Sequence, residues 1–235
     1  MGRKLIYDVG MHDGADTAYY LAKGFNVVAI EANPKLVLRA QETFNKEIRQ
    51  GRLVIIDKAI GQKGGTIRFG VHSKNDEWSS TDASRLKRFA EDMSIIEVEC
   101  VTLDSVISQY GCPHYLKIDI EGADLQAIEA LGQLKKRPKY VSAEAHTGLI
   151  AKRLHEFGYR MFMLVDQAAK NVKAPRRLWF FREGRYVRIN FTDSHSGPFG
   201  KEAPGKWVTI DEVLQDHDEK VATGKLTWHD FHAAL

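Results

Sequence analysis

The stretch LIYDVGMHDGADT, residues 5–17, joins an apolar run to a glycine-rich turn near the start of the chain. Many nucleotide-binding folds begin with such a strand and turn, because the turn lets a ligand approach bare backbone at the N-terminus of a helix. The same stretch also carries three carboxylates, from Asp8, Asp13 and Asp16. Since these would repel a pyrophosphate, the stretch predicts a ligand that is attracted by negative charge.

The overall composition is that of an ordinary globular domain. With 235 residues, of which 43% are hydrophobic and 28% charged, the chain can bury one sizeable core. A net charge of +3 from 34 basic and 31 acidic residues does not favour nucleic acid as a partner. Neither a membrane span nor a signal peptide is recognisable, so we expect a cytoplasmic protein. Cys100 and Cys112 are too few for a disulfide framework, and we expect both to be reduced.

Strand and helix signals alternate along most of the chain, which is typical of a parallel sheet covered by crossover helices. Apolar runs predict strands over residues 5–9, 26–33, 52–61, 114–122, 139–147, 160–165 and a final strand region at 177–190. Periodic apolar positions predict helices over residues 16–24, 33–51, 101–111, 123–134 and 151–159. We therefore predict one α/β domain over residues 1–190, with an insertion at about 64–100. A polar, glycine-rich tail with a short helix would follow over residues 191–235.

Ligands of an open α/β sheet bind outside the carboxyl ends of its strands. Beyond the first turn, the polar residues expected there are mostly acidic: Glu31, Asn33, Asp57, Asp119, Glu121, Glu144 and His146. Glu31 follows the first turn by about twenty residues, where an acidic side chain can accept both hydroxyls of an adenosine ribose. Asp57 lies where the third strand would pass an adenine edge. These positions predict a ligand that has a ribose but no phosphate.

S-adenosylmethionine fits this description, because it carries adenosine, a sulfonium and an ammonium with only one carboxylate. Asp13 and Asp16 have a second interpretation, as caps of the helix that follows the turn. Capping does not account for Asp8, Glu31 and Asp119 together. The whole set therefore predicts a pocket for S-adenosylmethionine.

Four segments resemble the successive signatures of the FkbM-type methyltransferases: YDVGMHDGADT, VVAIEANP, VIIDKAIG and LKIDIEGADLQAIEAL, within roughly residues 4–165. KIDIEGAD is the most specific, whereas the first turn is shared more widely among class I methyltransferases. The resemblance implies a Rossmann-like fold with a seven-stranded, mostly parallel sheet, helices on both faces and an antiparallel last strand. It also implies S-adenosylmethionine as methyl donor and O-methylation of a small molecule, sugar or natural product.

The cofactor-binding residues that this prediction names follow the first four strands: Asp8, Gly10, Met11, His12, Asp13, Gly14, Thr17, Glu31, Ala32, Asn33, Asp57, Ala59 and Asp119. By the resemblance, Asp8 and the two glycines of the turn shape the methionine pocket, and Glu31 holds the ribose. Asp57 and Ala59 flank adenine, and Asp119 lies beside the sulfonium.

Methyl transfer to oxygen needs a group that takes the hydroxyl proton of the acceptor. His146 is the first candidate, because it follows the fifth strand and an imidazole titrates near neutrality; Asp119 and Glu121 are alternatives. A structural histidine at a strand end would explain His146 equally well. Asp119, Glu121, Glu144 and His146 could instead bind Mg²⁺ or Mn²⁺. Their spacing matches no dedicated metal motif, so the sequence prediction contains no metal.

Something must cover the cofactor, because the first strand begins too early for the N-terminal helix that many methyltransferases use. The insertion and the tail are the two candidates. The predicted substrate-binding residues are Trp78, Ser80, Glu144, His195 and Phe199. The tail mixes aromatic and polar residues with glycine and proline turns, which suits a lid over a small-molecule acceptor. An ordinary surface loop or extension is the alternative for each segment.

Two other functions stay open. An NAD-dependent oxidoreductase would share the ribose-binding acid, but the first turn reads Gly10-x-x-x-Gly14 and not the dinucleotide glycine spacing. A non-catalytic module of the same fold would bind a nucleoside without turnover. The methyltransferase prediction requires a small-molecule acceptor and neither nucleic acid nor membrane. The sequence does not specify the acceptor, the choice between oxygen and nitrogen, or the oligomeric state.

Overall fold

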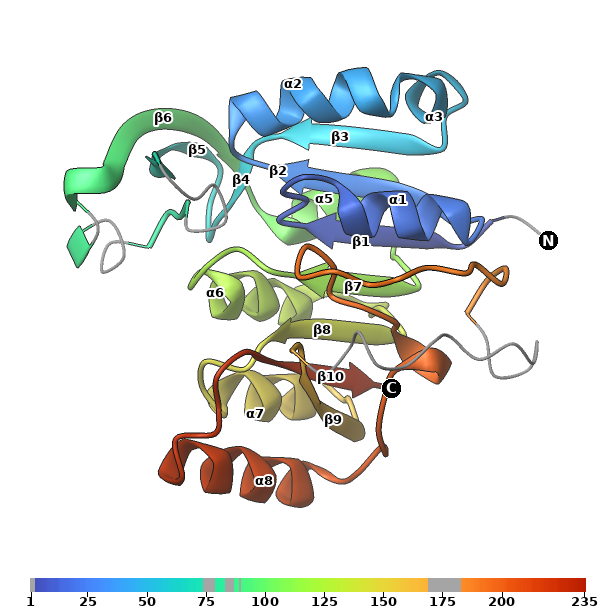
Figure 1. Ribbon diagram of the computed structural model, residues 1–235, viewed down its shortest axis with the longest axis vertical. Helices are drawn as coiled ribbons and strands as arrows, with labels where there is room; N and C mark the ends of the chain where they lie inside the picture. The colour runs from blue at the N-terminus through green and yellow to red at the C-terminus, as the bar shows by residue number, and fades with distance from the viewer. Residues whose placement is uncertain (1–2, 74–78, 83–86, 89, 169–182) are drawn as a thin grey trace.

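The computed structural model describes residues 3–73, 79–82, 87–88, 90–168 and 183–235. These residues form a seven-stranded sheet in the order β3-β2-β1-β7-β8-β10-β9 (Figure 1). Neighbouring strands from β3 to β8 are parallel, whereas β10 runs antiparallel to both β8 and β9. The predicted fold class, a mostly parallel sheet whose last strand is antiparallel, is therefore confirmed.

The strands of this sheet are β1 (Leu5–Val9), β2 (Asn26–Glu31), β3 (Leu53–Asp57), β7 (Tyr115–Ile118), β8 (Tyr140–Glu144), β9 (Met161–Asp166) and β10 (His229–Ala234). The helices are α1 (Ala15–Ala22), α2 (Pro34–Thr43), α3 (Asn45–Arg49), α5 (Leu103–Tyr110), α6 (Asp124–Glu129), α7 (Leu149–Glu156) and α8 (Ile210–Ala222). Short 3₁₀ helices are η2 (Ala90–Asp92), η3 (Ala130–Gln133) and η6 (Gly200–Glu202). Within the described ranges, no helix has the length and apolar character that crossing a membrane requires.

Two hydrophobic cores cover the two faces of the sheet. Successive side chains of a strand point to opposite faces, so Tyr7 and Val9 belong to one core and Ile6 to the other. The first core also contains buried residues of α5, α6, α7 and α8. The second contains residues of α1 and α2, together with Phe191 and Phe199 of the tail. On this second face, the irregular tail segment that contains Phe191 and Phe199 thus covers a part of the sheet that the helices leave uncovered.

The helix predicted over residues 33–51 is divided into α2 and α3 at Phe44. Asn33 caps α2, since its side chain accepts a hydrogen bond from the backbone N–H of Lys35. Phe44 leaves the helical conformation, with φ −103° and ψ 20°, and is buried beside the first turn. A Cβ at Gly14 would lie 2.6 Å from the Phe44 ring, so only glycine fits there. Packing against the turn therefore accompanies the break in the helix.

The insertion at about 64–100 contributes a second, smaller sheet. It contains β4 (Ala59–Ile60), β5 (Gly65–His72) and β6 (Met93–Val101), in the order β4-β6-β5. The whole of β5 pairs antiparallel with residues 93–100 of β6. Ser80 pairs with Gly70 in an isolated bridge, which holds the described part of the intervening loop against β5. The insertion is thus a hairpin beside the carboxyl ends of β1 and β2 (Figure 1).

The tail is part of the domain, which corrects the predicted boundary at residue 190. All six residues of β10 are buried, and this strand lies inside the sheet between β8 and β9. Phe199, predicted to contact substrate, is fully buried and stacks on the ring of Tyr115, with centroids 4.1 Å apart. The final strand region predicted at 177–190 is not a strand over residues 183–190, and residues 177–182 lie outside the described ranges. A lid alone would not supply an internal strand of the sheet.

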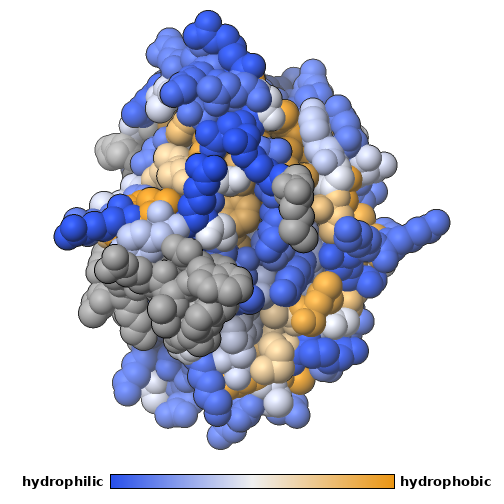
Figure 2. Space-filling model, turned by 90° about the vertical axis from the view of Figure 1, so that its right-hand side faces the viewer, coloured by the Kyte–Doolittle hydropathy of each residue, from blue (hydrophilic) through white to orange (hydrophobic). Residues whose placement is uncertain are grey.

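The two ends of the sheet differ in surface character. The parallel strands run from right to left in Figure 1, so their carboxyl ends meet near the hairpin. The opposite end faces the viewer in Figure 2 and carries mainly hydrophilic residues, with hydrophobic ones scattered between them. Scattered exposed hydrophobic residues are normal on a protein surface. A ligand site in such a sheet is expected at the carboxyl ends.

Replacing Phe199 with Ala should lower the free energy of unfolding by about 3–5 kcal/mol, because the change removes a buried aromatic ring and leaves a cavity. Urea unfolding followed by circular dichroism measures this loss. Leu38→Ala, at a position that is 62% exposed on α2, is the control. It should change stability by less than about 0.5 kcal/mol. Equal stability of the two variants would contradict a core role for the tail.

Candidate functional site

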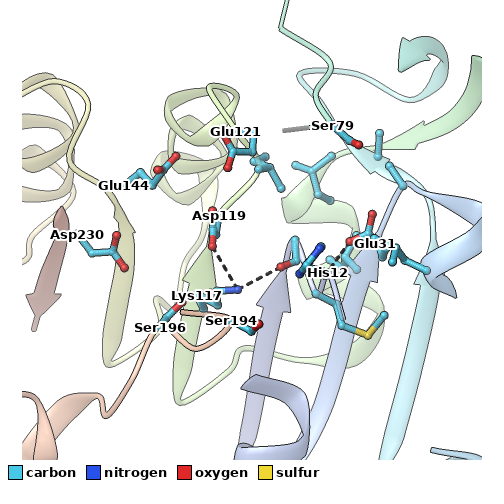
Figure 3. Close-up of a pocket in the computed structure, with 18 of the residues that line it drawn as sticks. His12, Glu31, Ser79, Lys117, Asp119, Glu121, Glu144, Ser194, Ser196 and Asp230 are labelled. Carbon is cyan, nitrogen blue, oxygen red and sulfur yellow. Dashed lines mark hydrogen bonds and ion pairs between the residues drawn. The ribbon is translucent and has the colours of Figure 1, made fainter. Parts of the chain in front are cut away.

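A cavity of about 570 Å³ opens at the carboxyl ends of β1, β2, β7 and β8. One side is formed by the first turn, the end of β2 and the small sheet: Gly10, Met11, His12, Glu31, Ala32, Leu36, Ala59, Ile60 and Phe69. The other side is mainly acidic and polar: Asp119, Glu121, Glu144, Gln167, Asp193, Ser194, His195, Ser196, Thr227, Trp228 and Asp230. Figure 3 shows that the carboxylates of Asp119, Glu121 and Glu144 gather on this second side. The volume of the whole cavity is in the range of small-molecule sites.

The first turn presents backbone to the cavity because Gly10 brings two elements close together. Gly10 has φ +83°, and a Cβ there would lie 1.8 Å from the carbonyl oxygen of Asp119. The backbone N–H groups of Gly10 and Met11 both donate to the carbonyl of Ile30, at 3.0 and 3.1 Å. The turn is therefore fixed between β2 and the end of β7, and any larger residue at position 10 would separate them.

Glu31 joins the first turn to the end of β2 through its side chain. Its Oε2 accepts a hydrogen bond from the backbone N–H of His12 at 2.9 Å, and its Oε1 accepts one from Asn33 at 2.8 Å. Burial raises the pKa of Glu31, while these backbone hydrogen bonds act in the opposite direction. Each carboxylate oxygen has a further lone pair available to a ligand in the cavity. Glu31 is thus a positioned acceptor at the place predicted for ribose.

The cation that balances the first-turn carboxylates comes from the chain itself. Lys117 on β7 is buried, and its Nζ lies 3.2 Å from Asp8, 3.4 Å from Asp16 and 3.5 Å from Asp119. It also donates to the carbonyl of Gly10 at 3.1 Å (Figure 3). Burial lowers the pKa of Lys117, but the three carboxylates outweigh this and raise it, so the ammonium stays charged.

This network changes the explanation given for the acidic turn. Asp8 and Asp16 are buried, do not line the cavity and face Lys117, so their charges are balanced within the protein. They are not free to attract a cationic ligand as the sequence argument assumed. Lys117 was not among the predicted residues, although a lysine in the otherwise apolar strand YLKI is a recognisable signal, because buried lysines are normally paired.

Several predicted cofactor residues support the site without lining it. Asp13 accepts from the backbone N–H of Ala15 at 2.9 Å, and Thr17 donates to Asp8 at 2.6 Å. Asn33 caps α2, Gly14 packs against Phe44, and Asp57 ends β3. The predicted residues that do line the cavity are Gly10, Met11, His12, Glu31, Ala32, Ala59 and Asp119.

The predicted catalytic residues occupy the acidic side of the cavity, with one exception. One carboxylate oxygen from each of Asp119, Glu121 and Glu144 lies within 4.8 Å of the others. His146 does not line the cavity; its Nε2 lies 2.6 Å from Oε2 of Glu144. Close to these residues, the pKa of Asp124 is raised to about 7. Burial is the main cause, and the negative charges of Glu144 and Asp119 add to it.

The tail and the hairpin close the sides of the cavity. Residues 193–196 of the tail line it, and the backbone N–H of Ser196 donates to both carboxylate oxygens of Asp16, at 3.0 and 2.9 Å. From the hairpin loop, Ser79 and Thr81 line the cavity. Ser80 lies behind this wall, where its hydroxyl donates to the carbonyl of Glu121 at 2.6 Å. Trp78 lies outside the described residues.

A group of residues at the carboxyl end of β9 and the start of β10 also faces the cavity, and none of them was predicted. Gln167, Thr227, Trp228 and Asp230 line this part, and the Gln167 side chain donates to Asp230 at 2.7 Å. Asp230 pairs with Glu144 across β10 and β8. Finding this group required knowledge that the last residues of the chain return to the sheet as the strand between β8 and β9.

Comparisons with known proteins identify the family of the chain. The family described as the methyltransferase FkbM domain matches residues 8–161. The chain belongs to this family of methyltransferases. The FkbM resemblance found in the sequence is therefore confirmed. A search of curated proteins found no match.

Three methyltransferases of low sequence identity are among the solved structures similar to this FkbM-family chain. An FkbM methyltransferase from Methylobacillus flagellatus KT is 17% identical with a TM-score of 0.46, over 69% of this chain and 40% of that one. Precorrin-6y C5,15-methyltransferase from Geobacter metallireducens GS-15 is 15% identical with a TM-score of 0.40, over 69% and 67%. A SAM-dependent O-methyltransferase from Thermotoga maritima is 11% identical with a TM-score of 0.41, over 98% and 58%. The chain thus spans less than half of the Methylobacillus protein.

Replacing Lys117 with Met in this FkbM domain should lower the free energy of unfolding by about 3–5 kcal/mol. The change leaves the buried carboxylates of Asp8 and Asp16 without their cation. Chemical unfolding measures the loss, and Lys152→Met, at an exposed position of α7, is the matched control. Adding Asp8→Asn to Lys117→Met should restore part of the stability, because one uncompensated charge is removed. If Lys117→Met is as stable as the control, the network does not hold the turn.

Proposed function

We propose that this methyltransferase binds S-adenosylmethionine and transfers its methyl group to an oxygen of a small-molecule acceptor. The observation that carries the proposal is Glu31, whose two oxygens are fixed by backbone N–H groups at the end of β2 and which faces the cavity beside Gly10. A carboxylate fixed in this way is suited to the two hydroxyls of a ribose. The family match supports methyl transfer as the reaction.

The residues around the cavity fit each part of the cofactor. Apolar side chains of Ala32, Leu36, Ala59 and Phe69 lie on the Glu31 side, where an adenine ring would be placed. The first turn, with the backbone of Gly10, would contact the methionine portion. Asp119 is 39% exposed and lines the cavity, so it can lie near a sulfonium as a counter-charge.

The first turn also favours this cofactor over NAD. A pyrophosphate would bind the N-terminus of α1 through its free backbone N–H groups. The carboxylate of Asp13 accepts from the N–H of Ala15 at that position. A second anionic group would therefore compete with Asp13 for the same donor and be repelled by it.

In the proposed reaction the bound cofactor supplies a methyl group: the acceptor oxygen forms the new C–O bond while the C–S bond breaks and S-adenosylhomocysteine leaves. The chain must orient the acceptor oxygen and accept its proton. His146, the base suggested by the sequence, does not line the cavity, whereas its partner Glu144 does. We therefore assign proton acceptance to the pair, with the carboxylate of Glu144 facing the acceptor and His146 behind it.

Isothermal titration calorimetry tests the cofactor. The full chain should bind S-adenosylhomocysteine at least about 10-fold more tightly than NAD, because Asp13 opposes a pyrophosphate and Glu31 serves the nucleoside that both ligands contain. Transfer of tritium from methyl-labelled S-adenosylmethionine to hydroxylated or amine-bearing small molecules then tests the reaction and separates an oxygen from a nitrogen acceptor. Tighter binding of NAD would make the cofactor assignment wrong.

Replacing Glu31 with Ala should weaken S-adenosylhomocysteine binding by about 1.5–3 kcal/mol, the range for hydrogen bonds to a charged acceptor. Calorimetry measures the affinity, and circular dichroism checks that the domain stays folded. Glu42→Ala, at an exposed position of α2, is the control and should leave the affinity unchanged. Unchanged affinity in the Glu31 variant would remove this residue from the ribose site.

A further inference from the structure

The backbone N–H groups of the first-turn residues that line the cavity are already used within the protein. Those of Gly10 and Met11 both donate to the carbonyl of Ile30, and that of His12 donates to Glu31. The methionine portion of S-adenosylmethionine, which the proposed function places at this turn, ends in a carboxylate. A carboxylate that leaves water for a cavity needs hydrogen-bond donors in exchange. Its donors must therefore come from another part of the cavity wall.

The two lysines of the cavity wall are also engaged with carboxylates of the protein. Lys117 contacts three carboxylates and donates to the carbonyl of Gly10. Lys58 pairs with Glu99, and it adjoins Ala59 on the side proposed for adenine. The carboxylates on the acidic side of the cavity would repel another one. The methionine carboxylate thus requires neutral donors that lie near the first turn but not on the adenine side.

The tail segment 193–196 brings neutral donors to this place. The backbone N–H of Ser196 donates to both carboxylate oxygens of Asp16, and Asp16 pairs with Lys117. Figure 3 shows Ser194 and Ser196, whose side chains carry hydroxyl groups, near Lys117 and away from Glu31. The segment is therefore held against the first turn on the side proposed for the methionine portion.

The imidazole of His195 is held in one tautomer by its own segment. Its Nδ1 accepts a hydrogen bond from the backbone N–H of Thr192 at 3.2 Å, and the Thr192 hydroxyl lies 2.9 Å from the same nitrogen. Because a backbone N–H can only donate, Nδ1 of the neutral ring carries no proton and Nε2 carries it. Phe191 packs edge-on against the ring, with centroids 5.6 Å apart. His195 thus lines the cavity as a positioned hydrogen-bond donor through Nε2.

We propose that the tail binds the carboxylate of the cofactor's methionine portion, with the Nε2–H of His195 as the main donor and the hydroxyls of Ser194 and Ser196 beside it. This inference rests on the proposed function. It assigns to the cofactor a histidine that the sequence had assigned to the acceptor. His12 also lines the cavity, but it lies beside Glu31, on the ribose side (Figure 3). Residues 193–196 lie beyond the family match, so the cofactor site would extend past residue 161.

Isothermal titration calorimetry of the full chain with S-adenosylmethionine and with its decarboxylated analogue tests the inference, because the two ligands differ only in the carboxylate. His195→Ala should weaken binding of S-adenosylmethionine at least about 10-fold, the effect of losing a hydrogen bond to a charged group. The same change should alter binding of the analogue less than about 2-fold, because its partner group is absent from that ligand.

Two further variants serve as comparison. His195→Gln should bind S-adenosylmethionine more tightly than His195→Ala, since the amide nitrogen of glutamine can replace Nε2 as donor. His155→Ala is the matched control, because His155 belongs to α7 and does not line the cavity. It should leave the affinity for both ligands unchanged. Circular dichroism checks that each variant is folded.

Two results would overturn the inference. Unchanged binding of S-adenosylmethionine in the His195→Ala variant would remove this residue from the cofactor site. Equal weakening of both ligands would show that the change acts on the fold of the tail and not on the carboxylate. Failure of the proposed function is recognised separately, because the wild type would then bind neither ligand. Binding of both ligands by the wild type supports the cofactor assignment whatever the variants show.

Discussion

The buried ammonium group of Lys117 is the interaction on which the carboxyl edge of the sheet depends. It contacts carboxylates that come from β1, from α1 and from the end of β7, and it donates to the carbonyl of Gly10. Without a cation at this point, Asp8, Asp16 and Asp119 would repel one another in a poorly solvated place. One side chain therefore holds the first turn, the helix after it and the fourth parallel strand in register.

The same network fixes a part of the cavity wall that is far from the first turn in sequence. Asp16, one partner of Lys117, accepts the backbone N–H of Ser196, so the segment 193–196 is joined directly to the first turn. Three residues later, Phe199 is stacked on Tyr115 of β7. Hydrogen bonding at one point and aromatic packing at the other give this irregular segment a defined position. The first turn and the tail segment 193–196 are therefore joined through a single ion-pair network.

The sequence predicted the strands of the main sheet up to β9 and the helices between them, because those features depend on local patterns such as the apolar runs and the first turn. It could not predict which ions pair, so the aspartates of the turn were interpreted as ligands for a cation when Lys117 already balances them. The strand β10, HDFHAA, was missed because polar residues interrupt its apolar ones, so the sequence shows no apolar run. All six residues of this strand are nevertheless buried. Phe199 was assigned to substrate because an aromatic residue in a polar tail fits a pocket and a core equally well.

The boundary of the family match separates the two halves of the site. The cofactor side, from Gly10 to Phe69, and the acidic residues Asp119 to Glu144 lie within the matched residues 8–161. Gln167, the segment 193–196 and the residues Thr227 to Asp230 lie beyond it, and they form the remaining wall of the same cavity. The matched part thus contains the residues that the proposed function assigns to the cofactor and to the proton. In the proposed reaction, the part of the wall built from residues beyond 161 would contribute to the choice of acceptor, and family membership does not describe those residues.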